Sequence, residues 1–292
     1  MNNRVKHKPI VGCMRWGSWG ANFSKEQYLK IIHQCIEVDL NEFDHADIYG
    51  DYTTEADFGA ALKNNSSLRS QLKLITKCGI KMMSPNRPAH YIKSYDASEL
   101  HIKASVENSL KQFNTDYIDT LLIHRPDVLM DVHEIANAIT ALKQEGKIKS
   151  FGVSNFTKDQ VELLNKHIKV DQHQVEISTT NLNVFHNGVL EQAQLNDIAI
   201  QSWSPLGNGL LDGTTETHKR ILTVAEQLSQ THSVSVTGIL LAFLYLHPAN
   251  IIPVMGTTKI ERLVEAKKAM DIQLTRTEFY QLWTAATGVE VA

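Results

Sequence analysis

Short apolar runs alternate with longer stretches of helical period along almost the whole chain. The first run, PIVGCM at residues 9–14, leads into a helical stretch at 24–39, and a second run, NEFDHA at 41–46, follows it. Apolar runs separated by helical patterns predict βαβ units with a parallel sheet. The further candidate strands are LKLITK at 72–77, YIDTLLIH at 117–124, IKSFGVS at 148–154, HQVEIS at 173–178, IAIQSWS at 198–204 and NIIPVM at 250–255.

Helix starts are marked by capping boxes, in which Ser, Thr or Asp is followed three residues later by Glu or Gln. Such a box precedes several of the helical stretches, and the two signals agree in placing a helix after each strand. The boxes are Ser24/Gln27, Asp96/Glu99, Asp131/Glu134, Thr157/Gln160, Thr258/Glu261 and Thr275/Glu278. Other helices are expected at 54–63, 98–113, 131–144, 158–167, 189–195 and 259–270, and helical stretches are expected within 216–246.

Eight strands, each followed by a helix, predict a single (β/α)8 TIM barrel domain over residues 1–292, with an extra C-terminal helix at 275–288. No linker rich in Pro, Gly or Ser divides the chain into two domains. No GxGxxG follows an early strand, as the dinucleotide-binding half of an open doubly wound sheet requires. The closed barrel is therefore favoured over the open sheet.

Composition argues against several kinds of partner. A net charge of -3, from 29 basic and 32 acidic residues, gives no electrostatic reason to expect nucleic acid. The uncharged segment 233–258 contains an apolar run of only eight residues, 239–246, so it predicts a buried helix and no membrane partner. Cys13, Cys35 and Cys78 lie far apart and lack CxxC spacing, which predicts no disulfide framework, no metal site and a reducing, cytoplasmic location.

Polar side chains follow three of the predicted strands. Asp44 ends the second strand with Tyr49 in the loop beyond it, Lys77 ends the third strand, and His124 ends the fourth. In a barrel the carboxyl ends of the strands carry the active site, so these four groups are candidates for catalysis. Taken one at a time, each also fits a structural role, since a Tyr after a strand commonly packs and a terminal Lys is commonly solvated.

Together, the four groups can serve proton transfer to a carbonyl oxygen. Asp44 on the adjacent strand should keep Lys77 charged, and an ammonium beside a phenol stabilises the phenolate. We therefore expect the pKa of Tyr49 to lie below its ordinary value, which suits a general acid. His124 should hydrogen-bond the same carbonyl oxygen and orient the substrate.

The segments that carry these groups resemble the aldo-keto reductase family, in particular its bacterial branch of predicted oxidoreductases. FDHADIYG is similar to the family's D-x-A-x-x-Y-G segment and TTEADFGAAL to its E-x-x-x-G-x-A-L helix. SLKQFNTDYIDTLLIHRPD and GKIKSFGVSNF resemble two further signatures, so the resemblance covers nearly the whole chain. It implies a (β/α)8 barrel that binds NADP(H) and reduces aldehydes or ketones with the tetrad Asp44, Tyr49, Lys77 and His124.

The resemblance also assigns residues to the cofactor. Ser154 and Asn155 of GVSNF, with Gln174 of QHQVEIS, take the nicotinamide carboxamide. Trp203 of SWSPLGNG takes the place of the ring that stacks on the nicotinamide, while the two tryptophans of RWGSW fit core packing as well. The other residues placed along the cofactor are Met14, Arg15, Trp16, Ser204, Leu206 and Gly209.

PVMGTTKIERLVEA resembles the adenosine end of the family's cofactor site. Thr257 and Thr258 begin a helix, whose unpaired N–H groups favour phosphate. Arg262 matches the guanidinium that grips the 2′-phosphate, and Glu265 matches the adenine contact. Gly256 stands where many members have Lys. NADP(H) is therefore expected in preference to NAD(H), chiefly because of Arg262.

The expected function is reduction of a small carbonyl compound, with two alternatives open. A metal-dependent barrel hydrolase also places Asp, His and Lys at strand ends, but it commonly has an HxH pair at the end of the first strand, where this chain has none. A cofactor-binding regulatory subunit of the same fold can retain the tetrad. The loops 80–95 and 205–214 and the tail after Trp283 should shape the substrate pocket. His45, Asp47, Arg125 and Asp127 are expected to serve structure.

Overall fold

A computed structural model describes residues 7–63 and 65–292 of the chain. Within this part, eight strands close into a barrel with the hydrogen-bonded order β1-β10-β9-β8-β7-β6-β3-β2. Each of the predicted strands is present, so the predicted (β/α)8 barrel is confirmed. The barrel strands are β1 (Ile10–Gly12), β2 (Glu42–Asp44), β3 (Lys73–Cys78), β6 (Ile118–Ile123), β7 (Ile148–Ser154), β8 (Gln172–Glu176), β9 (Ala199–Trp203) and β10 (Ile252–Met255).

Helices alternate with the barrel strands as predicted. The helical stretches expected within 216–246 are two helices, because Ser233 adopts a left-handed φ of 53° and Ser235 caps the second helix. A short antiparallel pair, β4 (Ile80–Lys81) and β5 (Ser94–Tyr95), lies outside the predicted pattern. The α-helices are α1 (Lys25–Glu37), α2 (Tyr49–Tyr52), α3 (Thr54–Leu62), α4 (Ser66–Arg69), α5 (Glu99–Phe113), α6 (Val132–Gln144), α7 (Lys158–Asn165), α8 (Val189–Leu195), α9 (Glu216–His232), α10 (Val236–Tyr245), α11 (Ile260–Lys268) and α12 (Arg276–Thr287). The 3-10 helices are η1 (Asn183–Phe185), η2 (Leu210–Asp212) and η3 (Ala269–Asp271).

Several of the predicted capping boxes are confirmed. In each, the cap hydroxyl accepts from the N–H three residues on, and the Gln or Glu there accepts from the cap N–H in return. The box predicted at Asp96 is wrong, because Ser98 is the N-cap of α5. The confirmed boxes begin α1, α7 and α12 at Ser24, Thr157 and Thr275.

The chain falls into two compact units. The N-terminal unit comprises Ile10–Gln174 and Gly256–Ile260, and the C-terminal unit comprises Val175–Met255 and Glu261–Ala292 with residues 7–9. That the whole chain forms a single domain stays a prediction. In residues 7–63 and 65–292, no helix combines the length and the apolar character that crossing a membrane requires.

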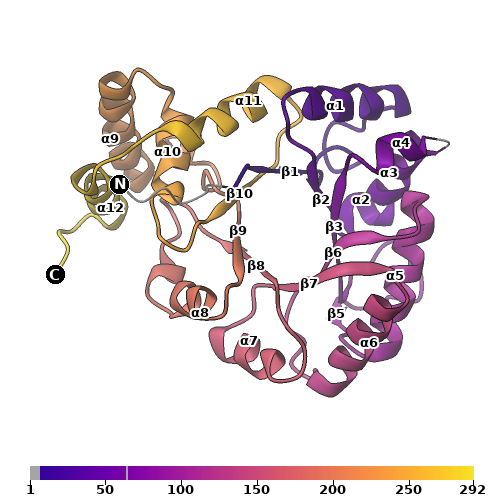
Figure 1. Cartoon of the computed structure of the whole chain (residues 1–292). Coiled ribbons are helices and arrows are strands. Elements are labelled where there is room, and N and C mark those ends of the chain that lie inside the picture. The colour runs from indigo at the N-terminus through magenta and orange to yellow at the C-terminus, as the bar shows by residue number, and fades with distance from the viewer. Residues whose placement is uncertain (1–6, 64) are drawn as a thin grey trace. The chain divides into compact units, whose positions relative to one another are not determined.

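In the N-terminal unit, neighbouring strands are paired so that their carboxyl ends meet at one edge. β1 pairs with β2 in parallel, with Gly12 opposite Asp44. β3 pairs with β6 in parallel, with Lys77 opposite Leu122. The helices α1, α3, α5 and α6 lie outside these strands (Figure 1). The edge that carries the predicted catalytic residues is therefore set by strand register.

An aromatic cluster forms the core of the N-terminal unit beside these strands. The ring of Trp16 lies 5.7 Å from Tyr28 and 6.0 Å from Phe43, and all three side chains are fully buried. His45 packs edge-on against Phe58 in α3, with 4.6 Å between ring centroids. Burial lowers the pKa of His45 to about 3, so the imidazole is neutral. As expected, His45 serves packing.

In the C-terminal unit, α10 is the buried helix that the uncharged segment predicts. Every residue from Gly238 to Tyr245 is buried. The ring of Phe279 in α12 stacks on Phe243 in α10, with 4.4 Å between centroids. Phe185 meets Trp283 of α12 edge-on at 5.3 Å. The predicted extra C-terminal helix is thus α12, and aromatic contacts of this kind add to the apolar area that it buries.

Candidate active site

The four predicted catalytic side chains all belong to the N-terminal unit, and three of them stand at strand ends. Asp44 is the last residue of β2, Lys77 the last but one of β3, and His124 follows β6, while Tyr49 begins α2. All four are buried, with exposed fractions of at most 9%. Burying an ionisable group costs folding free energy unless the group is paired or hydrogen-bonded, so buried groups of this kind point to a structural or functional role.

The turn that carries Tyr49 depends on Gly50. Gly50 has φ 59° and ψ 38°, a left-handed conformation that glycine adopts without steric cost. A Cβ at this position would lie 2.5 Å from the hydroxyl oxygen of Thr54. The DIYG sequence therefore holds Tyr49 directly ahead of a kink that a larger residue would strain.

The ammonium of Lys77 connects the other groups. Its Nζ donates to both carboxylate oxygens of Asp44 at 2.7 Å, to the carbonyl oxygen of His45 at 2.8 Å and to the hydroxyl oxygen of Tyr49 at 3.2 Å. Burial lowers the pKa of Lys77, but Asp44 and then Tyr49 more than offset this, so the pKa lies above its ordinary value. Lys77 stays charged, and Asp44 is the anion that keeps it so.

The pKa of Tyr49 differs from the expectation. Burial raises the pKa of Tyr49 above its ordinary value, and the charge of Lys77 offsets only part of that rise. The predicted lowering is therefore wrong, because removal from water disfavours the phenolate more than an ammonium already paired with Asp44 favours it. Tyr49 is fully protonated at neutral pH.

His124 faces this group as a neutral imidazole. Its ring lies 6.2 Å from that of Tyr49, nearly perpendicular to it. Burial first, then the positive charges of Lys77, Arg125 and Lys93, hold the pKa of His124 well below its ordinary value. Its Nδ1 is buried and has no hydrogen-bond partner in the part of the chain that the structure describes. A buried polar atom of this kind has hydrogen-bonding capacity for a ligand.

The ends of β7 and β8 bring three of the residues assigned to the cofactor to the same edge. Ser154 pairs with Gln174 in strand register, and the Asn155 side chain donates to the Ser154 hydroxyl at 2.7 Å. Gln174 also donates from Nε2 to Asp44 Oδ1 at 2.8 Å. Sequence reasoning missed this second contact, since 130 residues separate the two and no local motif links them.

Trp16 does not fit its assignment to the cofactor. Its side chain is fully buried among aromatic rings and has no surface to offer a ligand. Its Nε1 donates to the carbonyl oxygen of Thr257 at 3.1 Å, which ties the segment 256–258 to the first loop. The assignment of the Trp16 side chain is therefore corrected to a positioning role. Met14 and Arg15 beside it are exposed.

The remaining residues assigned to the cofactor are divided between the units. In the N-terminal unit, Gly256 has open space around it, because a Cβ there would meet no atom within 4 Å. In the C-terminal unit, Ser204 and Gly209 adopt left-handed φ values of 50° and 71° after β9. Also in that unit, Arg262 is exposed and Glu265 half-buried on α11. The others are Thr257 and Thr258 in the N-terminal unit, and Trp203 and Leu206 in the C-terminal unit.

Two further expectations concern Asp127 and metals. Asp127 accepts from the backbone N–H of Ala97 and of Leu129, so it stabilises its loop as expected. Among residues 7–63 and 65–292, no group of three or more His, Cys, Asp or Glu side chains could hold a metal ion.

Comparison with known proteins agrees with the fold and the motifs. The model of the Aldo/keto reductase family matches residues 10–286. A solved structure of an aldo/keto reductase from Klebsiella pneumoniae, in complex with NADP and acetate, superposes with a TM-score of 0.73 at 24% identity, and it covers 94% of this chain and 89% of that one. At 24% identity, this superposition shows that the two proteins share a fold.

Two curated relatives are more similar in sequence. The Bacillus subtilis protein named "Uncharacterized oxidoreductase YcsN" is 41% identical over 286 residues, which are 97% of this chain and 95% of the relative. A "6-dehydroglucose reductase" of Agrobacterium fabrum is 37% identical over 285 residues, again 97% of this chain and 95% of the relative.

Proposed function

The chain belongs to the aldo/keto reductase family and is an oxidoreductase, and on this premise we propose that it reduces an aldehyde or ketone to an alcohol with NADP(H), with Tyr49 as the general acid. One observation carries the proposal: the buried Lys77 ammonium donates to the Tyr49 hydroxyl oxygen while Asp44 holds it charged. This is the arrangement that proton transfer to a carbonyl oxygen needs.

Tyr49 supplies the proton. Its hydroxyl oxygen accepts from Lys77, so the single phenolic proton points elsewhere and can be donated to a substrate oxygen. Burial keeps that proton in place until a substrate binds. As the proton leaves, negative charge develops on the phenol oxygen, and the ammonium 3.2 Å away stabilises it. Asp44 contributes by fixing the position and charge of Lys77.

His124 orients the carbonyl group. As a neutral imidazole it can donate one hydrogen bond to the carbonyl oxygen without competing with Tyr49 as the acid. Its position beyond β6, with the ring near that of Tyr49, lets both groups reach one oxygen. Two donors aimed at the same atom lower the energy of the charge that develops there.

NADP(H), when bound, supplies the hydride. In the N-terminal unit, the polar ends of β7 and β8 fit a carboxamide, with Ser154 and Asn155 as its partners. In the C-terminal unit, Arg262 is exposed on α11 and fits a 2′-phosphate, and Trp203 ends β9 as a stacking ring. The complex of the Klebsiella pneumoniae relative with NADP supports this choice of cofactor.

A panel of carbonyl compounds tests the function. Aldehydes, ketones and dicarbonyls are supplied with NADPH, and its absorbance is followed with time. Because the Agrobacterium fabrum relative is named as a 6-dehydroglucose reductase, the panel includes hydroxylated aldehydes. We expect NADPH oxidation that depends on the carbonyl compound and yields the alcohol. A protein that oxidises NADPH with no member of the panel contradicts the proposal.

A further inference from the structure

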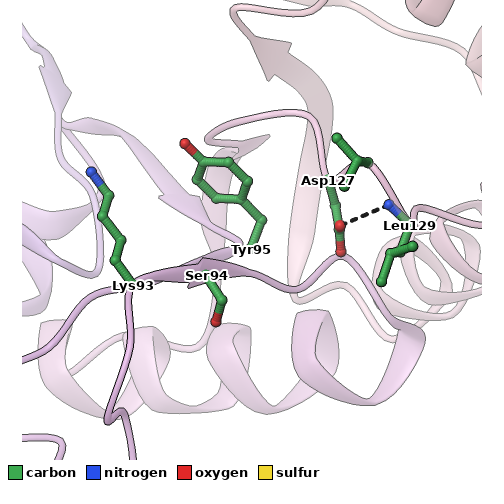
Figure 2. A pocket seen from close by; sticks show the side chains of 6 residues that line it. Lys93, Ser94, Tyr95, Asp127 and Leu129 are labelled. Atoms are coloured by element: carbon green, nitrogen blue, oxygen red, sulfur yellow. Dashed lines mark hydrogen bonds between the residues drawn. The ribbon is translucent and has the colours of Figure 1, made fainter.

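A pocket lies in the N-terminal unit, between segments that follow the strands carrying Lys77 and His124. It has a volume of about 440 Å³, which is within the range of small-molecule sites. Two short segments, 93–95 and 127–129, form its walls (Figure 2). Its lining residues are Lys93, Ser94, Tyr95, Asp127, Val128 and Leu129.

The wall formed by 127–129 continues from the strand that delivers His124. Asp127 comes three residues after His124, so their Cα atoms are at most about 11 Å apart. Val128 and Leu129 follow directly, and their side chains are 93% and 87% exposed. Apolar side chains left open at the lip of a pocket mark a surface that a ligand can cover.

The second wall is tied to the strand that delivers Lys77. Tyr95 of β5 pairs with Ile80 of β4, which comes three residues after Lys77. The next residue, Asp96, donates from its N–H to the carbonyl oxygen of Gly79 at 2.9 Å. Both walls therefore extend from strand ends that carry proposed catalytic groups, so the pocket lies on the carboxyl-terminal side of those strands.

Asp127 holds the two walls together. Its Oδ2 accepts from the N–H of Ala97 at 3.2 Å, in the segment that follows β5. Its Oδ1 accepts from the N–H of Leu129 at 2.9 Å, the contact drawn in Figure 2. The carboxylate is thus engaged by backbone donors of both walls. The backbone of the fold thus fixes both walls of the pocket. Asp127, the acidic residue in its lining, already accepts hydrogen bonds from that backbone.

Lys93 is the cation of this pocket. Figure 2 shows its side chain and that of Tyr95 extending to the same side of β5, while Ser94 extends to the other. Within the described residues its ammonium makes no ion pair, since Asp127 is bound to backbone and Asp96 is paired with Lys81. Its positive charge nevertheless contributes to the lowering of the pKa of His124.

We propose that this pocket binds the far end of a carbonyl substrate that carries an anionic group on an apolar or aromatic body, and that Lys93 selects that charge. The Tyr95 ring, Val128 and Leu129 offer apolar contact, and the unpaired ammonium offers a charge-assisted hydrogen bond. The inference rests on the proposed function, because it assumes that the carbonyl end reaches Tyr49 and His124.

A matched pair of ligands isolates the charge. 4-(Hydroxymethyl)benzoate and its methyl ester have the same ring and the same alcohol, and they differ in that the ester has an uncharged –COOCH₃ group in place of the carboxylate. Their affinities for the full chain are measured by calorimetry in saturating NADPH, with which an alcohol cannot react, for the wild type and for Lys93→Met. Lys111→Met is the control, because Lys111 is exposed in the last turn of α5, away from the pocket.

We expect the wild type to prefer the acid, and Lys93→Met to reduce that preference about fivefold, as for a partly exposed ion pair. Lys111→Met should retain the wild-type ratio, and added salt should reduce the ratio in the wild type and in Lys111→Met but not in Lys93→Met. Equal binding of acid and ester by the wild type, no binding of either, or an unchanged ratio in Lys93→Met would overturn the inference.

The matching aldehydes, 4-carboxybenzaldehyde and its methyl ester, are then tested for NADPH oxidation. A charge preference without turnover on any carbonyl would refute the proposed function and leave the pocket assignment standing.

Discussion

Lys77 donates a hydrogen bond of 3.2 Å to the hydroxyl oxygen of Tyr49, and both side chains are buried. Burial raises the pKa of Tyr49, so the phenol keeps its proton before the substrate binds. Once the proton moves to a carbonyl oxygen, the same ammonium stabilises the phenolate. Burial thus favours the protonated phenol at rest, and Lys77 supports its ionised form in the transition state.

Removing one partner of the buried ion pair should destabilise the fold. Lys77→Met leaves the Asp44 carboxylate buried without its cation, which costs about 3 to 5 kcal/mol in the free energy of unfolding. Asp44→Asn alone should cost a similar amount, because it leaves an unpaired ammonium. The double variant should lose much less than the sum of the two. Denaturant unfolding of all four proteins checks this, and additive losses would show that the two groups do not interact.

Substitution of Gly50, at the kink after Tyr49, should cost more stability than substitution of a left-handed glycine that has open space around it. Gly146 also has a left-handed φ, of 70°, but a Cβ there would meet nothing within 4 Å. Gly146→Ala should therefore cost only about 1 to 2 kcal/mol. Gly50→Ala adds a clash with Thr54, so it should cost more stability and also lower turnover by displacing Tyr49. Equal stability and equal turnover in the two variants would contradict this account.

Glu55 should make stability depend on pH. Burial raises the pKa of Glu55 to about 7, against hydrogen bonds from Thr76 and Ser109 that lower it. Between the ordinary pKa of Glu and about 7, the folded protein holds a proton that the unfolded chain has lost. The bound proton therefore stabilises the folded protein. This stabilisation is fully present below the ordinary pKa of Glu and is lost as the pH rises through about 7, which changes the free energy of unfolding by about 3 kcal/mol.

Glu55→Gln should remove that dependence. The amide keeps hydrogen-bonding partners in Thr76 and Ser109 and carries no titrating proton. We expect its free energy of unfolding to vary less than that of the wild type between pH 5 and 8 in denaturant titrations. Glu226→Gln, an exposed change on α9, should keep the wild-type slope. A wild-type slope in Glu55→Gln would show that this carboxyl does not set the dependence.

Much of the architecture could be predicted from sequence because it rests on local patterns. The eight strands are short apolar runs bounded by helical stretches, and the barrel follows from their alternation. The placement of Asp44, Lys77 and His124 on one edge followed from their positions at strand ends. Those predictions needed only the direction of the chain and the parallel order of strands.

Other features depend on the balance of forces in the folded state. The pKa of Tyr49 is set by burial against the charge of Lys77, and sequence alone gives no measure of burial. The contact of Gln174 with Asp44 joins distant segments. The pair β4 and β5 has two residues in each strand, too short for a periodic signal, yet it shapes the pocket that contains Lys93.

The preference for NADPH should depend on Arg262. Arg262→Gln should raise the KM for NADPH about tenfold, from loss of charge-assisted hydrogen bonds to the 2′-phosphate, with the KM for NADH unchanged. Arg276→Gln, at the start of α12, serves as the control. Gly256→Lys places a second cation where the structure has open space, so it should increase the preference. A KM that rises equally for both cofactors would assign Arg262 another role.

The central claim is that Tyr49 donates the proton, and Tyr49→Phe tests it most directly. The variant removes one oxygen and should lower kcat about 100- to 10,000-fold while the Kd for NADPH stays as in the wild type. Tyr28→Phe makes the same chemical change at another buried phenol and should leave kcat unaltered. Single-turnover reduction of the best aldehyde in the panel, with NADPH binding followed separately, gives both quantities. A Tyr49→Phe protein that turns over at the wild-type rate would contradict the account.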